Sequence, residues 1–280
     1  MAASPTATLA HVTAGEWSRV YEPAEDSWLL SDAVCSDSGA WLRGGAAPPA
    51  LVLELGSGSG AVCTSVLLFL QQQQAPPAAC LACDVSPFAC RVTAATAAAN
   101  GVGARLDVVQ CDLLDALRAR LRGAVDLLLF NPPYVPTPSH EVPPRGAFAV
   151  AAAAAAAAEA SEEEGRAAAG ALPAPAPAEA ALDTLPAAWA GGENGREVID
   201  RALPLLQELL RRPAAGGGDA GDAGDAGGTA YLLLLEDNDP KDIARLLAAL
   251  GLATAIVARR QAPCESLLVM RVQWAKGASS

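Results

Sequence analysis

The chain has 280 residues, of which 52% are hydrophobic and 18% charged, and its formal net charge is -12 at pH 7. This acidic balance argues against a broad phosphate-binding surface, so nucleic acid is not expected as the main partner. We expect no membrane span, because no segment has about 18 strongly apolar residues in a row. We also expect no secretory signal, because the first residues are small and polar, without a charged start followed by an apolar core. Seven cysteines, an odd number, suit a reducing compartment. We therefore expect a cytoplasmic protein and leave the nucleus open.

A single domain is expected over residues 19 to 275, after a flexible lead-in over residues 1 to 18. Two low-complexity insertions interrupt this domain at about 145–183 and 213–228. Alanine, proline and acidic residues dominate the first insertion, and Gly-Asp-Ala repeats dominate the second. Neither composition builds a packed core, so we expect both to be surface loops.

The first candidate helix start lies in the stretch VYEPAEDSWLL, Val20 to Leu30. Glu25 and Asp26 carry negative charge where the N-terminal end of a helix is electrically positive. Two interpretations stay open for this stretch. It is an ordinary capped helix, or it is a helix start at which Tyr21, Glu25 and Ser27 reach over a bound cofactor.

A glycine-rich turn follows the first expected strand, Leu51 to Leu55. Gly56, Gly58 and Gly60 lead from this strand into a helix expected over Ala61 to Leu70. Glycines allow the backbone to approach a ligand closely and to take positive φ. Gly56, Gly58 and Ala61 also satisfy the dinucleotide fingerprint G-x-G-x-x-G/A. Alone it therefore indicates a nucleotide-like ligand of either kind, or merely a tight turn.

Acidic residues follow the next two expected strands. Ala78 to Cys83 ends at Asp84, where a carboxylate is placed to accept both hydroxyls of a ribose. Leu106 to Gln110 is followed by Asp112. Two roles stay open for Asp112: facing an adenine amino group, or capping a helix expected over Leu113 to Leu121.

Cys80 and Cys83 have C-x-x-C spacing, which in other settings marks a metal or redox site. They fall in an expected strand, where positions three apart face opposite sides. We therefore interpret them as small core residues and predict no metal site.

The fourth expected strand, Val125 to Phe130, ends at the sequence Asn-Pro-Pro-Tyr. Pro132 and Pro133 cannot extend a central ladder, so Asn131 is presented at the carboxyl end of the strand. Ligands of open α/β sheets bind at these ends. The amide of Asn131 offers an acceptor and donors, and Tyr134 offers a flat apolar wall with a polar tip. Such a pocket suits a planar amide or an amino-bearing ring.

Three further strands and a helix complete the pattern: Ala230 to Leu235, the helix Pro240 to Leu250, then Ala253 to Ala258 and Ser266 to Val272. Strands alternate with helices until a closing pair of strands. This order indicates an α/β fold with a mostly parallel seven-stranded sheet that ends in an antiparallel hairpin.

Taken together, the glycine-rich turn, the acids after the second and third strands and the Asn-Pro-Pro-Tyr motif resemble the class I S-adenosylmethionine-dependent methyltransferases. VYEPAEDSWLL and AAWAGGENGREVIDR, residues 187–201, resemble the eukaryotic and archaeal HemK-type branch, the release-factor glutamine methyltransferases. The resemblance implies a Rossmann-like fold and S-adenosyl-L-methionine as the methyl donor. It also implies methylation of the glutamine amide in the Gly-Gly-Gln motif of a class-1 translation release factor.

The same resemblance assigns site residues. Its cofactor contacts fall on Tyr21, Glu25, Ser27, Glu54, Gly56, Gly58, Asp84, Asp112 and Asn131. Its catalytic and substrate contacts fall on Asn131, Pro132, Pro133 and Tyr134. We expect Asn131 Oδ1 and the Pro132 carbonyl to accept the two N–H bonds of the substrate amide, with Tyr134 packed against the amide plane.

Similar enzymes pair with a small zinc-containing activator subunit, so a heterodimer is expected. The strand Leu106 to Val109 is a candidate partner surface if it lies at an open sheet edge, and an ordinary covered edge if the chain itself shields it. Two other functions stay open: methylation of protein lysine or of adenine N6, and a non-catalytic methyltransferase-like subunit.

Overall fold

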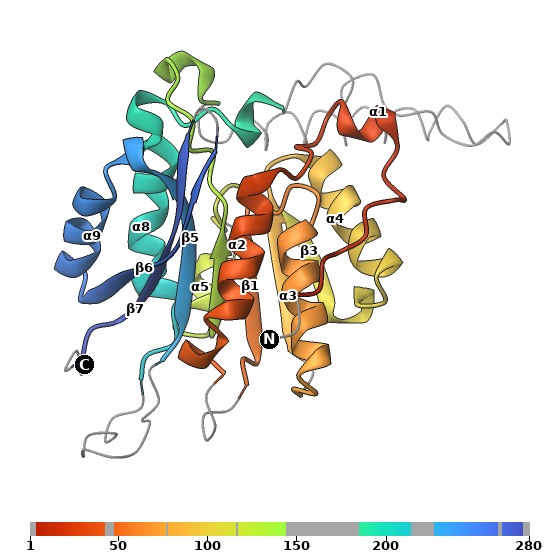
Figure 1. Cartoon of the computed structure of the whole chain (residues 1–280), viewed down its shortest axis with the longest axis horizontal. Coiled ribbons are helices and arrows are strands. Elements are labelled where there is room, and N and C mark those ends of the chain that lie inside the picture. Colours follow the sequence, from red (N-terminus) through yellow and green to blue (C-terminus); the bar gives the residue numbers. More distant parts are fainter. Residues whose placement is uncertain are drawn as a thin grey trace, which may run out of the picture.

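The computed structural model of the chain describes residues 4–42, 48–76, 78–115, 117–143, 185–213, 227–262 and 265–276. The insertions expected at about 145–183 and 213–228 lie almost entirely outside these residues. All strands of the described part belong to one seven-stranded sheet (Figure 1). None of the helices in this part is long and apolar enough to span a membrane.

The sheet is mostly parallel, as the order of its elements predicted. Its strands are β1 (Leu51–Leu55), β2 (Ala79–Asp84), β3 (Leu106–Gln110), β4 (Leu127–Phe130), β5 (Thr229–Leu235), β6 (Leu252–Gln261) and β7 (Ser266–Trp274). They lie in the order β3-β2-β1-β4-β5-β7-β6. The first five run parallel to one another, and β7 runs antiparallel to both β5 and β6. The predicted closing hairpin is therefore confirmed.

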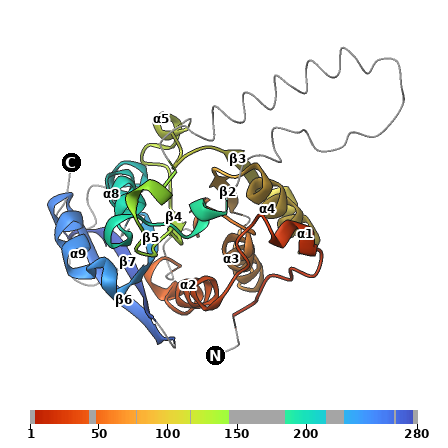
Figure 2. The same ribbon diagram turned by 90° about the horizontal axis from the view of Figure 1, so that it is seen from above.

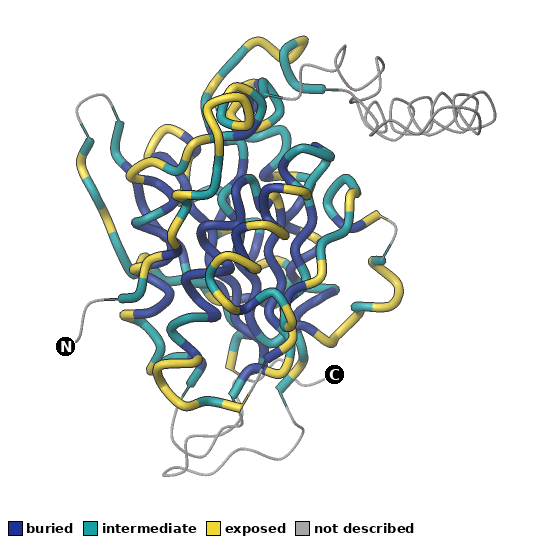
Figure 3. Tube along the Cα trace, turned by 90° about the vertical axis from the view of Figure 1, so that its right-hand side faces the viewer, coloured by how far each residue is buried: buried dark blue, intermediate teal, exposed yellow. Residues whose placement is uncertain are grey.

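Helices cover both faces of the sheet (Figure 2). The helices of the described part are α1 (Ala14–Trp17), α2 (Glu25–Ser36), α3 (Ala61–Gln72), α4 (Pro87–Ala99), α5 (Arg118–Leu121), α8 (Glu197–Leu209) and α9 (Pro240–Ala249). In Figure 2, α2, α3 and α4 lie along one face, and α5, α8 and α9 lie along the other. Because both faces are covered, the central strands β4 and β5 are buried along their whole length. Figure 3 shows the buried residues gathered in the interior of the molecule.

The helix expected over Leu113 to Leu121 is wrong for its first half. Leu113 and Leu114 have φ values of 45° and 73°, which are left-handed and incompatible with an α-helix. Only Arg118–Leu121 is helical, as α5. The chain after β3 therefore forms a turn, and this turn keeps Asp112 and Leu113 against the cavity described below.

Residues 4 to 18, expected to be part of a flexible lead-in, instead pack onto α3 and α4. Ala7 is buried, and its N–H donates to Ser65 Oγ at 3.0 Å. The N–H of Thr8 donates to Asn100 Oδ1 at 2.8 Å. Thr13 caps α1 through a reciprocal capping box. This part of the chain leads into Val20 and Tyr21, and thus places the start of α2 over the carboxyl end of the sheet (Figure 1).

Candidate active site

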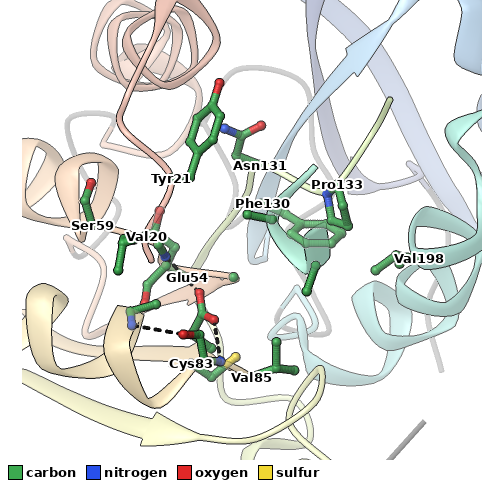
Figure 4. Close-up of a pocket in the computed structure, with 18 of the residues that line it drawn as sticks. Val20, Tyr21, Glu54, Ser59, Cys83, Val85, Phe130, Asn131, Pro133 and Val198 are labelled. Atoms are coloured by element: carbon green, nitrogen blue, oxygen red, sulfur yellow. Dashed lines mark hydrogen bonds between the residues drawn. The ribbon is translucent and has the colours of Figure 1, made fainter. Parts of the chain in front are cut away.

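One cavity opens at the carboxyl ends of β1, β2, β3 and β4, where the sequence placed its candidate residues. Of the predicted site residues, those that line it are Tyr21, Ser27, Glu54, Gly56, Gly58, Asp84, Asp112, Asn131 and Pro133. In Figure 4, Tyr21 and Asn131 lie at one end of the cavity, and Cys83 and Val85 lie at the other. These residues come from segments far apart in the sequence, so the fold assembles one site from them.

The glycine-rich turn forms one wall. Gly56, Gly58 and Gly60 have φ values of 63°, 54° and 74°, a conformation that is costly for any residue with a Cβ. The turn holds its shape by a hydrogen bond from Ser57 N to the Cys83 carbonyl, 3.0 Å long. The main chain itself therefore faces the cavity, and α3 begins directly behind it.

The carboxylate of Asp84 binds the backbone of this turn and of the segment that follows β2. Its Oδ2 accepts from Gly58 N at 2.9 Å, and its Oδ1 accepts from Ser86 N at 2.8 Å. Burial raises the pKa of Asp84, and the backbone N–H groups that it accepts oppose that shift. Each carboxylate oxygen keeps acceptor capacity beyond its one backbone bond. Recognition of a ribose by Asp84 stays a prediction, and it would use this remaining acceptor capacity of the carboxylate.

Asp112 meets a partner that the sequence analysis missed. Arg201 of α8 donates from Nη2 to Asp112 Oδ2 at 2.6 Å, and both residues line the cavity. Because Leu113 and Leu114 are left-handed, Asp112 does not cap a helix over Leu113–Leu121, and that alternative is wrong. The Nε atom of Arg201 is buried without a hydrogen-bond partner among the described residues. The only signal for Arg201 was its place at the end of the motif AAWAGGENGREVIDR.

Asn131 is held by a residue that the sequence analysis had assigned only to a helix start. Its Nδ2 donates to Asp26 Oδ2 at 2.9 Å, and the Tyr134 hydroxyl donates to the same oxygen at 3.2 Å. Asn131 Oδ1 is buried and has no partner among the described residues. Asn131 therefore combines an amide nitrogen bound to Asp26 with a buried, unpaired amide oxygen, and the residue itself lines the cavity.

Tyr134 differs from the predicted flat wall. It is buried behind Asn131 and is not among the residues that line the cavity, whereas Pro133 and Tyr21 are. Burial raises the pKa of Tyr134 and of Tyr21, and the nearby Asp26 carboxylate raises both further. Both phenols therefore keep their protons at neutral pH and can act only as neutral hydrogen-bonding groups.

Three other predicted residues take different positions. Glu25 is the first residue of α2 and is exposed, and it is not among the residues that line the cavity. Pro132 is buried and does not line it either. Glu54 does line it, but its Oε2 accepts from Cys63 N at 3.1 Å, and burial raises its pKa well above the ordinary value. The roles assigned to these three residues stay predictions.

The Asn-Pro-Pro-Tyr segment packs against the loop before α8. Val135 N donates to the Trp189 carbonyl at 3.1 Å, and Gly191 N donates back to the Val135 carbonyl at 2.9 Å. Asn238, fully buried, donates from Nδ2 to the Tyr134 carbonyl at 2.9 Å. A Cβ at Gly195 would lie 1.9 Å from that same carbonyl oxygen, so only glycine fits there.

Comparison with known proteins places this site in a family. No protein-family model matches the chain. The chain is 35% identical over 267 residues to the mouse (Mus musculus) methyltransferase HEMK2, with 95% of each protein covered. It is 28% identical over 262 residues to the eRF1 methyltransferase catalytic subunit mtq2 of Schizosaccharomyces pombe, with 92% of this chain and 90% of that protein covered.

Among solved structures, the catalytic domain of hMettl16, in complex with the MAT2A 3′UTR hairpin 6, has the same fold. The TM-score is 0.50 at 12% identity, with 92% of this chain and 73% of that chain covered. At this identity the likeness concerns the fold alone. The match to HEMK2 extends over nearly the whole of both proteins and includes the Asn-Pro-Pro-Tyr segment. The chain belongs to the HEMK2 family of HemK-type class I methyltransferases.

Proposed function

We propose that the chain transfers a methyl group from S-adenosylmethionine to the side-chain amide of a glutamine. The substrate is the Gly-Gly-Gln motif of a class-1 translation release factor. The observation that carries this proposal is the Asn131 amide, whose Nδ2 is bound to Asp26 and whose Oδ1 is buried without a partner. An acceptor fixed in this way suits a substrate nitrogen that carries N–H bonds. The fission yeast relative is named for its action on eRF1, which agrees with this substrate class.

The residues around the cavity fit S-adenosylmethionine. Gly56 and Gly58 have no Cβ to block close approach of a ligand to the backbone of the turn, and Asp84 keeps acceptor capacity for ribose hydroxyls. Asp112 and Arg201 line the same cavity and are bound to each other, and they are the residues that would contact the adenine ring. When bound, S-adenosylmethionine supplies a methyl group on a positively charged sulfur, which is reactive without further activation.

The difficulty of the reaction lies in the glutamine amide, because its nitrogen lone pair is delocalised into the carbonyl group. In the proposed mechanism, Asn131 Oδ1 accepts one N–H of this amide and the Pro132 carbonyl accepts the other. Two acceptors hold the nitrogen in one orientation and stabilise the positive charge that it gains.

No strong base is needed near the amide. Tyr21 and Tyr134 have raised pKa values and stay protonated, so neither takes up the proton at neutral pH. The Asp26 carboxylate lies behind Asn131 and does not line the cavity. The proton is therefore lost to water once the nitrogen carries positive charge, and positioning supplies most of the rate enhancement.

The test is transfer of a labelled methyl group from S-adenosylmethionine to a recombinant class-1 release factor, with the activator protein present. A Gln→Asn release factor is the matched control, because it keeps the amide but shortens the side chain by one carbon. We expect label on the Gln form and none on the Asn form. Equal labelling of both would refute glutamine methylation. No labelling of either, with cofactor still bound, would favour lysine or adenine acceptors, or a non-catalytic role.

We further propose that the chain acts in a heterodimer with a small zinc-containing activator subunit. The fission yeast relative is named a catalytic subunit, which implies at least one other subunit in that enzyme. In this chain β3 lies at one edge of the sheet, and Asp107 and Gln110 on it are exposed. An edge strand with free backbone groups can accept a strand from a partner. A cytoplasmic location fits a substrate that acts in translation.

A further inference from the structure

Asp26 is the second residue of α2 and is 3% exposed. Its carboxylate accepts four hydrogen bonds. Ser27 N and Ser27 Oγ donate to Oδ1 at 2.7 Å and 3.2 Å. Asn131 Nδ2 and the Tyr134 hydroxyl donate to Oδ2 at 2.9 Å and 3.2 Å. These four bonds and the positive end of α2 compensate for burying a negative charge.

The two ends of the Asn131 amide are chemically different, and an ionised carboxylate can only accept hydrogen bonds. The NH₂ end of Asn131 must therefore face Asp26. The reversed amide would set Oδ1 against the Asp26 carboxylate, two acceptors without a proton between them, and would offer donors to the ligand instead. In the observed orientation Oδ1 is the unpaired end of the amide, buried without a hydrogen-bond partner among the described residues, and Asn131 is one of the residues that line the cavity.

We propose that Asp26 is a positioning residue for catalysis, which fixes the Asn131 amide so that its oxygen, and not its nitrogen, meets the substrate. This inference rests on the proposed function only for the identity of the substrate group that donates a hydrogen bond to Asn131 Oδ1. Tyr134 takes part by donating to the same carboxylate oxygen, which limits the rotation of that carboxylate.

Asp26 does not act as a base in this proposal. All four of its ordinary acceptor positions are occupied, and Asp26 itself does not line the cavity. A base must reach the proton that it removes. The role of Asp26 is therefore exerted through Asn131, and a loss of Asp26 should lower the rate without weakening cofactor binding to a similar degree.

The test compares Asp26→Asn with Asp32→Asn. The first variant keeps the shape of the side chain but introduces an NH₂ group. This group can donate a hydrogen bond to Asn131 Oδ1, so the Asn131 amide can reverse. The second removes the same charge from an exposed position of the same helix. We expect kcat to fall about tenfold or more in Asp26→Asn, as for loss of a preorganised polar group. Cofactor affinity should stay within about twofold, and Asp32→Asn should match the parent enzyme.

A double-mutant cycle separates positioning from a general structural effect. In an Asn131→Ala background, Asp26→Asn should cause no further loss beyond about twofold, because the group that it positions is gone. If the two losses in kcat multiply instead, Asp26 acts independently of Asn131 and the proposal is wrong. The readout is labelled methyl transfer at saturating cofactor and substrate.

NMR of the Asn131 side-chain amide tests the inference even if the release factor is not the substrate. In the parent enzyme, a proton bonded to a carboxylate should resonate downfield and exchange slowly with water. It should move upfield in Asp26→Asn. A parent-enzyme signal typical of a free, solvent-exposed amide would overturn the proposal, whether or not the variant folds. Failure of methyl transfer in the parent enzyme would count against the proposed function alone.

Discussion

Gly195 offers a sharp test of how the Asn-Pro-Pro-Tyr segment is held. Its φ is +67°, and a Cβ there would lie 1.9 Å from the Tyr134 carbonyl oxygen and 2.5 Å from Asn238 Nδ2. Neither neighbour can move freely. The first is backbone, and the second is a fully buried side chain that bridges the Tyr134 and Asn194 carbonyls at 2.9 Å each.

The cost of Gly195→Ala follows from two terms. A left-handed conformation costs an alanine about 1 kcal/mol. Displacing Asn238 leaves buried polar groups unpaired, at about 1–3 kcal/mol each. We therefore expect Gly195→Ala to lower the free energy of unfolding by about 3–5 kcal/mol. Any folded fraction should have displaced Asn131 and a rate at least tenfold lower.

Gly101→Ala is the matched control. Gly101 has a similar φ of +74°, but a Cβ there would meet nothing within 4 Å. This variant should lose only the conformational term of about 1 kcal/mol. The assay is urea-induced unfolding of both variants, followed by methyl transfer under native conditions. Equal losses of stability in the two variants would show that the contact with Tyr134 is unimportant, and would refute the reasoning.

Four further substitutions test the site and the partner surface. Asn131→Ala should lower kcat about a hundredfold or more, with a smaller loss of cofactor affinity; near-normal turnover would exclude its role. Asp84→Ala should raise the Kd of the cofactor about tenfold or more, because it removes charge-assisted hydrogen bonds, and an unchanged Kd by calorimetry would contradict the ribose assignment. Burial raises the folded-state pKa of Glu54, so the unfolded chain ionises first and the free energy of unfolding falls as the pH rises from about 4.3 toward the folded-state pKa. Glu54→Gln should therefore gain stability relative to the parent protein over that window, and a pH-independent difference would speak against it. Val108→Asp on β3 should reduce co-purification with the activator subunit, and intact co-purification would exclude this edge as the interface.

The sequence predicted the fold well because its signals are local. Continuous apolar runs such as Leu127–Phe130, and the breaks that follow them, mark buried parallel strands and their ends. The turn after β3 was missed for the same reason. Leu113 and Leu114 look like ordinary helix formers, and nothing in their local sequence signals the left-handed conformation that they adopt.

Site residues were predictable where a strand end presents them, and not where a distant partner defines them. Asp84 and Asn131 follow strands directly, so topology alone brought them to one edge of the sheet. Asp26 and Arg201 act through contacts that span 105 and 89 residues of sequence. An acid in the first turn of a helix already has a sufficient local explanation in the helix dipole, and this explanation hid its contact with Asn131.

The rigidity of the Asn131 site comes from three separate parts of the chain. Asp26, near the start, fixes the side chain of Asn131, while Gly195 and Asn238, toward the end, fix the backbone of Tyr134. The two prolines between them restrict φ, so little freedom is left in the segment as a whole. A methyl transfer that depends on positioning needs this arrangement, because a weak nucleophile gains its rate from being held in one orientation. The glycines of the loop before α8 let that loop pack directly against the Asn-Pro-Pro-Tyr backbone, because they have no side chains, and we therefore expect them to support the rate without contacting a ligand.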